Sequence, residues 1–185
     1  MDFNQLIDQC HSAAKKNGWW DEPRPHEEII LLIKSELFEA MDAYRSDKRA
    51  NKLELNVVFT GGRSASKKIA FANHFRTHIK DTFEDEIADT AIRIFDYLGF
   101  LGLPVKKSVI NTAYTGAFMA VLGNLDSHFV HVKHGTTDDT TVFRLVNCLL
   151  TLEELAKTYD FDLHTHIQLK LRYNATRGKK HGKEF

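Results

Sequence analysis

Proline and cysteine are scarce in this sequence, and neither sign of charge is in excess. The three prolines among 185 residues leave room for long helices, because proline breaks helix interiors. The two cysteines, Cys10 and Cys148, are too few and too far apart for a disulfide framework or a zinc-binding set, which favours a reducing compartment. Lysine plus arginine and aspartate plus glutamate number 25 each, so no basic excess indicates a nucleic-acid or membrane surface.

Long apolar runs are missing as well. No stretch is long enough to span a bilayer, and Met1-Asp2-Phe3-Asn4 lacks the basic start and apolar run of a signal peptide. We therefore expect a cytoplasmic protein that binds neither membranes nor nucleic acids. A chain of 185 residues is most simply one domain, over 1–185, with a sizeable core.

Apolar residues recur at helical spacing along most of the chain. The predicted helices span residues 2–16, about 26–45, 81–101, 105–133 and 138–158, with a last one starting after Asp162. Residues 46–80 show no such pattern and are predicted to be an extended loop region. The sequence therefore predicts an all-α, bundle-like fold.

Two pairs of carboxylates stand out in this pattern. Glu36 and Glu39 lie three apart in the second predicted helix, and Glu86 and Asp89 lie three apart in the third. Residues three apart share a helix face, so each pair directs two carboxylates the same way. Glu36 falls within the apolar stripe, where an acid is costly unless it is paired or bound to a cation. Two facing pairs predict a divalent metal site, with solvated surface acids as the alternative.

The ligand types restrict the metal. Di-iron bundles use Glu-x-x-His, whereas the last position of each pair here is Glu39 or Asp89. An all-oxygen set favours Mg²⁺, with Mn²⁺ as a substitute. Because Mg²⁺ held by carboxylates takes further ligands from water and phosphates, the pattern points to phosphate-ester chemistry.

The last predicted helix carries complementary charges. Lys170, Asn174 and Arg177 recur at i, i+4 and i+7, with Tyr173 alongside. Two cations, an amide and a phenol on one face suit a polyphosphate and a polar ring. An ordinary solvated basic face is the alternative.

Arg93 and Trp20 complete the candidate substrate-binding set. Arg93 lies on the same polar face of its helix as Glu86 and Asp89. The Trp19-Trp20 pair offers a ring that could stack a nucleotide base. Packing of one or both rings into the core is the alternative.

Several sequence blocks stand in an order typical of one enzyme family: residues 16–21, 31–40, 44–45, 85–96, 170–177 and 180–183. In these blocks the chain resembles the MazG-like, all-α nucleoside triphosphate pyrophosphohydrolases. The blocks cover about half of the chain, and each alone is modest. The resemblance implies a helical bundle of this type, with extra helices inserted before the C-terminal helix.

The resemblance also implies an activity. Members cleave nucleoside or deoxynucleoside triphosphates between the α and β phosphates with Mg²⁺, giving a monophosphate and pyrophosphate, and assemble as homodimers or homotetramers. The family's metal ligands would be Glu36, Glu39, Glu86 and Asp89. Glu36 or Glu39 would be catalytic, by orienting or deprotonating the attacking water. The residues that approach the nucleotide would be Lys170, Asn174 and Arg177.

Two departures from the family affect substrate choice and assembly more than chemistry. Residues 46–80 lengthen the spacing between the acidic motifs, and the helices over 104–158 are inserted. The inserted helices would form a lid, part of a dimer contact or a thicker bundle. A nucleotide- or partner-binding bundle with little catalysis is a second hypothesis, against which the intact acids and bases argue. A di-metal redox bundle is disfavoured by the missing Glu-x-x-His.

Overall fold

The computed structural model describes residues 2–51, 54, 65–102, 105, 118–133 and 139–182. Its helices are α1 (Phe3–Lys16), α2 (His26–Arg45), α4 (Ala65–His78), α5 (Phe83–Leu101), α6 (Phe118–Lys133), α7 (Asp139–Thr158) and α8 (Leu163–Asn174), followed by the short 3₁₀-helix η2 (Lys179–Gly182). The described ranges contain no β-strand, so the predicted all-α class is confirmed. None of the described helices is both long and apolar enough to cross a lipid bilayer.

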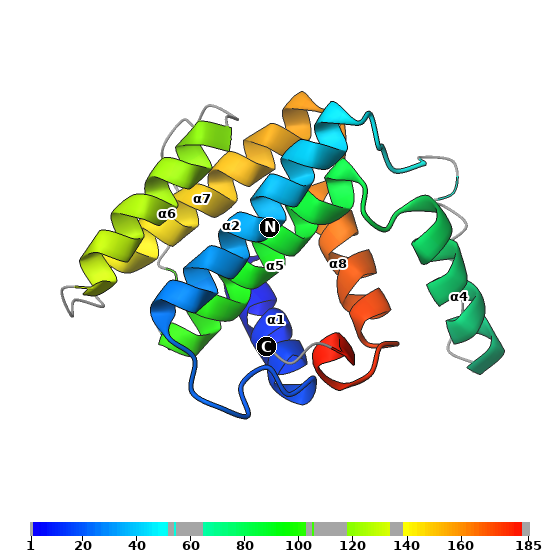
Figure 1. The fold of residues 1–185 in the computed structure, drawn as a ribbon, viewed down its shortest axis with the longest axis horizontal. Helices are drawn as coiled ribbons and strands as arrows, with labels where there is room; N and C mark the ends of the chain where they lie inside the picture. The colour runs from blue at the N-terminus through cyan, green and yellow to red at the C-terminus, as the bar shows by residue number, and fades with distance from the viewer. Residues whose placement is uncertain are drawn as a thin grey trace.

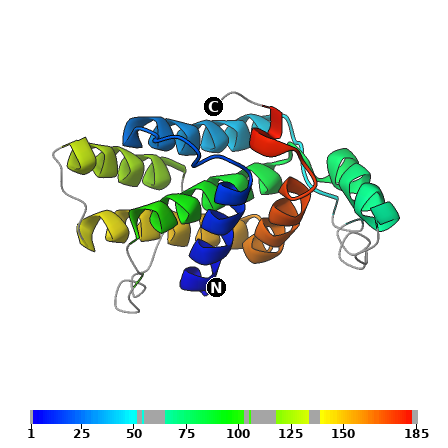
Figure 2. The same cartoon turned by 90° about the horizontal axis from the view of Figure 1, so that it is seen from below.

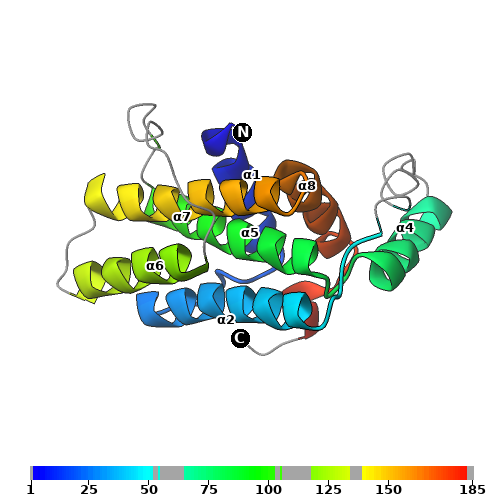
Figure 3. The same ribbon diagram turned by 90° about the horizontal axis from the view of Figure 1, so that it is seen from above.

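Helix α5 lies at the centre of the fold (Figure 1). It packs against α1, α2, α7 and α8, and Figure 3 shows it running between α2 and α7. The helix begins after Thr82, whose hydroxyl accepts a hydrogen bond from the Asp85 N–H. It ends at Gly102, whose φ of +66° lies in the left-handed region that glycine adopts without steric cost. Both ends of the central helix are therefore defined by their sequence.

The clearest helical patterns gave accurate boundaries. Helix α2 begins and ends as the sequence predicted, and α7 starts within one residue of its expected position. Asp162 caps α8 as predicted, because its side chain accepts a hydrogen bond from the His164 N–H at 3.2 Å. Of the predicted helix 105–133, the structure forms 118–133, while 106–117 fall outside the described residues.

Helices α6 and α7 form a further layer of the bundle. They pack against each other, α6 also contacts α2, and α7 also contacts α5 (Figure 2). An ion pair between Lys34 of α2 and Asp126 of α6 also joins α6 to α2. Within the described residues, α6 and α7 therefore pack directly on the central helices.

The prediction of a loop over 46–80 was wrong for residues 65–78, which form α4. This helix stands to one side of the bundle, next to α8 (Figure 1). A small separate core joins the α4 region to α8: Phe71, Phe75, Ile79, Leu169 and Tyr173. The three α4-side residues are spaced by four, which is a helical period, but the polar residues between them obscured the pattern.

Helices α1 and α5 cross closely at Gly99. A Cβ atom at this position would lie 2.5 Å from Cβ and 2.7 Å from Cγ of His11, closer than real Cβ atoms approach. The two helices can therefore cross this closely only because residue 99 has no side chain. It also fixes the position of the next turns of α1, which carry Cys10 and Ala13.

We expect Gly99→Ala to destabilise the protein, because the added methyl group must push α1 away from α5. Overpacking typically costs about 1–3 kcal/mol, of which the better helix propensity of alanine recovers up to about 1 kcal/mol. Urea unfolding measures the difference. Gly123→Ala in α6 is the control, since a Cβ there meets no atom within 4 Å. Equal or greater stability of Gly99→Ala would contradict the close crossing.

Candidate functional site

Three of the predicted metal ligands converge between α2 and α5. Glu36 comes from α2, whereas Glu86 and Asp89 come from α5, and one carboxylate oxygen of each lies within 4.8 Å of the others. Glu36 and Glu86 are buried, and Asp89 is half-buried. The three acids meet because α2 and α5 pack side by side along their length. The structure thus brings together acids from both motifs.

A cavity of about 230 Å³ lies beside these acids. Its walls come from α1, α2, α5 and α8 and from the turns next to them. Eight residues selected from the sequence line it: Glu36, Glu39, Glu86, Asp89, Arg93, Lys170, Asn174 and Arg177. The acidic motifs and the basic residues near the end of the chain therefore share one cavity.

Glu39 occupies a different position from the other acids. It lines the cavity but is exposed, and its carboxylate is not part of the convergent group. Positions three apart on a helix differ by about 60° around its axis, so α2 turns Glu36 inward and leaves Glu39 at the rim. In the described part of the chain, Glu39 forms no ion pair. The structure gives three convergent ligands where the sequence predicted four.

Arg93 partly neutralises Glu36. Its Nε and Nη2 atoms lie 2.7 and 2.5 Å from Oε1 of Glu36. Burial raises the pKa of Glu36, the charge of Asp89 raises it further, and Arg93 opposes both effects. Burial alone would lower the pKa of Arg93, but the charges of Glu36 and Asp89 raise it above its ordinary value. Arg93, predicted to contact substrate, is thus engaged with an acid of the cavity wall.

Glu86 is strongly affected by burial. Burial raises its pKa from 4.5 to about 9; Lys170 lowers the pKa, and the charges of Asp85 and Asp89 raise it. No hydrogen bond reaches its carboxylate from the described residues. A carboxylate that is so costly to ionise by itself gains much from a nearby cation.

Lys170 is buried, not solvent-exposed, with 4 % of its surface accessible. Its Nζ atom lies 2.6 Å from Oδ2 of Asp85 and 3.0 Å from Oδ2 of Asp89. Burial alone would lower the pKa of Lys170, but the charges of Asp89, Asp85 and Glu86 raise it above its ordinary range. The alternative of a solvated basic face is therefore wrong for this residue. Asp85, which the sequence analysis did not select, fixes its position.

Asn174 and Arg177 line the cavity from the end of α8. The helix ends at Asn174, so Arg177 follows a turn and does not continue the helical stripe that the sequence predicted. The Arg177 guanidinium lies 5.8 Å from the ring centre of Tyr173. Oδ1 of Asn174 is buried and has no hydrogen-bond partner in the described structure. A buried polar atom of this kind is costly unless water or a ligand satisfies it.

Two predicted substrate-binding residues, Tyr173 and Trp20, do not line the cavity. Tyr173 stacks on Phe75 of α4, with ring centres 4.4 Å apart. The indole N–H of Trp20 donates to Asp96 at 2.8 Å, and its ring stacks on Phe100 with centres 4.4 Å apart. Tyr173 therefore packs α8 on α4, and Trp20 packs the turn after α1 on α5. For Trp20 this is the alternative of packing against the core.

Trp19 lines the cavity in place of Trp20, the tryptophan chosen from the sequence, and so does Arg24, which the sequence analysis did not select. The Arg24 guanidinium lies 5.6 Å from the Trp19 ring centre, and its Nη2 atom lies 2.5 Å from Oε1 of Glu28. Neighbouring residues of a turn point in different directions, so the sequence did not reveal which tryptophan faces the cavity. The available signal for Arg24 was its place between Pro23 and Pro25, in a stiff connection.

A scan against protein-family models, a search of curated proteins and a search of solved structures each gave no match for this chain. The family resemblance therefore stays a prediction from the sequence. What supports a function is the geometry of the cavity itself.

Glu86→Gln should stabilise the metal-free protein at alkaline pH. Because the folded pKa of Glu86, about 9, lies above its ordinary 4.5, the folded state binds this proton more tightly. Its favourable contribution to stability is complete below about pH 4.5 and is lost as pH rises toward about 9. Near pH 8 in EDTA the variant should be more stable by at least about 1 kcal/mol, the value of one pKa unit. Urea unfolding at about pH 5 and pH 8 measures this.

Mg²⁺ should reverse the order of stability. It should stabilise the unaltered protein through the ionised Glu86 and have a smaller effect on Glu86→Gln. Glu22→Gln, which alters an exposed acid that does not line the cavity, is the control and should respond like the unaltered protein. A loss of stability in Glu86→Gln at pH 8 in EDTA would rule out the assigned burial cost.

Proposed function

We propose that this protein is a Mg²⁺-dependent nucleoside triphosphate pyrophosphohydrolase, which converts a nucleoside or deoxynucleoside triphosphate and water to the monophosphate and pyrophosphate. The observation that carries the proposal is the shared cavity. Convergent acids, several lysine and arginine side chains and an amide line the same space. Carboxylates beside cationic groups suit a polyphosphate that arrives with a divalent cation.

The acid cluster fits Mg²⁺ by its ligand types. Glu36, Glu86 and Asp89 offer only oxygen ligands, within 4.8 Å of one another. Mg²⁺ is held by a few carboxylates and keeps its other positions for water and phosphate oxygens. When bound, the ion would neutralise phosphate charge and lower the pKa of a bound water.

Glu39 is the better candidate for orienting or deprotonating the attacking water. The sequence left Glu36 and Glu39 as alternatives, but Glu36 is buried and held by Arg93. Glu39 lines the same cavity at its exposed rim and is free of ion pairs in the described chain. A carboxylate at the rim of the cavity can orient a water molecule or accept its proton.

The basic residues would hold the phosphates. Lys170 is bound to Asp85 and Asp89, so a cation at Asp89 would compete for that carboxylate and leave ammonium donors for phosphate oxygens. Arg177 would add a contact to phosphate, whereas the unsatisfied Oδ1 of Asn174 is an acceptor and would take a hydrogen bond from a sugar hydroxyl group. Trp19, which lines the same cavity, would stack on the base.

A binding role with little turnover is the second candidate. It is favoured by one observation, namely that Glu36 and Asp89 are already paired with Arg93 and Lys170. Assembly as a homodimer or homotetramer and a cytoplasmic location are parts of the first proposal. Neither candidate involves nucleic acid or a membrane.

Phosphorus NMR of the products tests the reaction. With Mg²⁺ and a panel of triphosphates, we expect the monophosphate and pyrophosphate as products, because cleavage falls between the α and β phosphates. Glu39→Gln should lower the rate by about a hundredfold or more, the usual contribution of general base catalysis. The Glu22→Gln control should keep the original rate. Diphosphate and orthophosphate as products would reject the proposal, and binding without turnover would favour the second candidate.

Arg177→Ala should lower kcat/KM by roughly ten- to a hundredfold, as expected for one charge-assisted contact to phosphate worth about 1.5–3 kcal/mol. The melting temperature should change little, because Arg177 is half-exposed and lies outside the helix core. Arg45→Ala, which removes an exposed cation at the end of α2, is the control. Unchanged kinetics with a lowered melting temperature would assign Arg177 a structural role only.

A further inference from the structure

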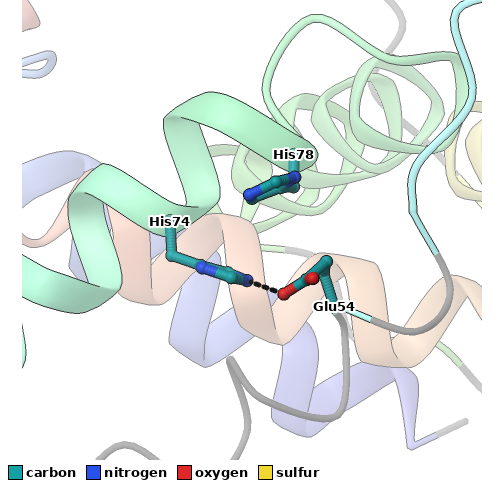
Figure 4. Close-up of side chains that lie close together, drawn as sticks. All are labelled: Glu54, His74 and His78. Atoms are coloured by element: carbon teal, nitrogen blue, oxygen red, sulfur yellow. Dashed lines mark ion pairs between the residues drawn. The ribbon is translucent and has the colours of Figure 1, made fainter.

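A second group of ligand-type side chains lies away from the acidic cavity, at α4. One donor atom each of Glu54, His74 and His78 lies within 4.8 Å of the other two. Figure 4 shows the two imidazole rings on neighbouring turns of α4, with the Glu54 carboxylate beside them. All three side chains are half-buried, and none lines the acidic cavity. Nothing in the proposed hydrolysis uses them.

The spacing of the histidines is that of a helical metal site. His74 and His78 are four residues apart, so they project from one face of α4, and their ring centres are 4.5 Å apart. Two imidazoles at i and i+4 on a helix are the arrangement with which helical zinc sites hold their ion. His78 is also the last residue of α4, and the C-terminal end of a helix favours a nearby cation.

Backbone hydrogen bonds place Glu54 beside this pair. The N–H of Asn51 donates to the carbonyl of His78 at 3.3 Å, and the N–H of Glu54 donates to the carbonyl of Asn51 at 3.1 Å. Asn51 is thereby tied to the end of α4, and Glu54 to Asn51. The third ligand thus reaches the histidines from a different part of the chain.

The contact between Glu54 and His74 is close but poorly directed. Oε2 of Glu54 lies 2.9 Å from Nε2 of His74. That nitrogen is nevertheless buried without a hydrogen-bond partner in the described residues, because the oxygen lies away from the direction in which the nitrogen points. Two ligands of one tetrahedral zinc ion, each at about 2.0–2.2 Å from it, lie roughly 3.4 Å apart. Small side-chain shifts would therefore let both atoms bind a common ion.

We propose that Glu54, His74 and His78 form a binding site for a transition-metal ion, of which Zn²⁺ fits best. Two imidazole nitrogens and one carboxylate oxygen suit Zn²⁺, whereas Mg²⁺ prefers oxygen ligands alone. Three protein ligands leave a fourth position for water. The ion would cross-link α4 to Glu54 and add to the small core by which α4 packs on α8.

Cobalt absorption tests the site in the full-length protein. Co²⁺ replaces Zn²⁺ and absorbs visible light strongly when bound by four ligands, and excess Mg²⁺ keeps the acidic cavity filled. We expect one equivalent of Co²⁺ to bind and Zn²⁺ to displace it. His74→Ala and His78→Ala should each lower the Co²⁺ affinity by about a hundredfold or more, because loss of even an outer partner of a ligand costs about 10–100-fold.

Two further variants distinguish loss of a ligand from binding at a different histidine and from loss of the fold. His164→Ala removes an exposed histidine of α8 and should bind Co²⁺ normally. Glu54→Gln keeps the shape of the side chain and should weaken Co²⁺ binding without loss of helix content by circular dichroism. If an alanine variant fails to fold, the Co²⁺ affinity of Glu54→Gln decides the proposal. The proposal is overturned if the unaltered protein gives no Co²⁺ absorption, or if the alanine variants and Glu54→Gln bind like His164→Ala. Either result leaves the hydrolysis proposal untouched, because the two sites share no residue.

Discussion

The buried ion pair between Lys170 and Asp85 holds the cavity together. Their charged atoms lie 2.6 Å apart, with 4 % and 1 % of the two residues exposed. Burial raises the pKa of Asp85 to about 6 even though Lys170 lowers it, so each charge relies on the other. The pair joins the first turn of α5 to the middle of α8. Helix α5 also carries Glu86 and Asp89, and α8 also carries Asn174, so the pair links the two helices that supply these groups to the cavity.

Helix α8 separates two parts of the molecule. Lys170 and Asn174 face the acidic cavity, whereas the residues just before them, Leu169 and Tyr173, pack on the α4 side. Arg172 also contacts that side, 3.8 Å from the ring centre of Phe71. Because adjacent residues of one helix contact both sides, a shift of α4 relative to α8 would also move the α8 side chains that line the cavity. The proposed metal at α4 would oppose such a shift.

The sequence predicted elements and motifs well wherever a helical period was unbroken. Glu36 was recognised as a site residue because it stands in an apolar stripe, and the structure places it at the cavity. The orientation and burial of other residues depend on tertiary contacts, which the sequence pattern does not show. The side of the turn that Trp20 faces depends on Asp96, 76 residues later, and the burial of Asp85 depends on Lys170. Helix α4 was missed because its apolar face is narrow and meets only a small separate core.

The contact at Gly99 sets the distance between α1 and α5, and with it the width of the cavity. Helix α1 supplies Cys10, Ala13 and Ala14 to the cavity lining, and its distance from α5 is limited by the hydrogen atom at Gly99. Residue 99 itself does not line the cavity. Any larger residue there would push α1 away from α5 and widen the cavity, while the acids and bases that line it stay the same.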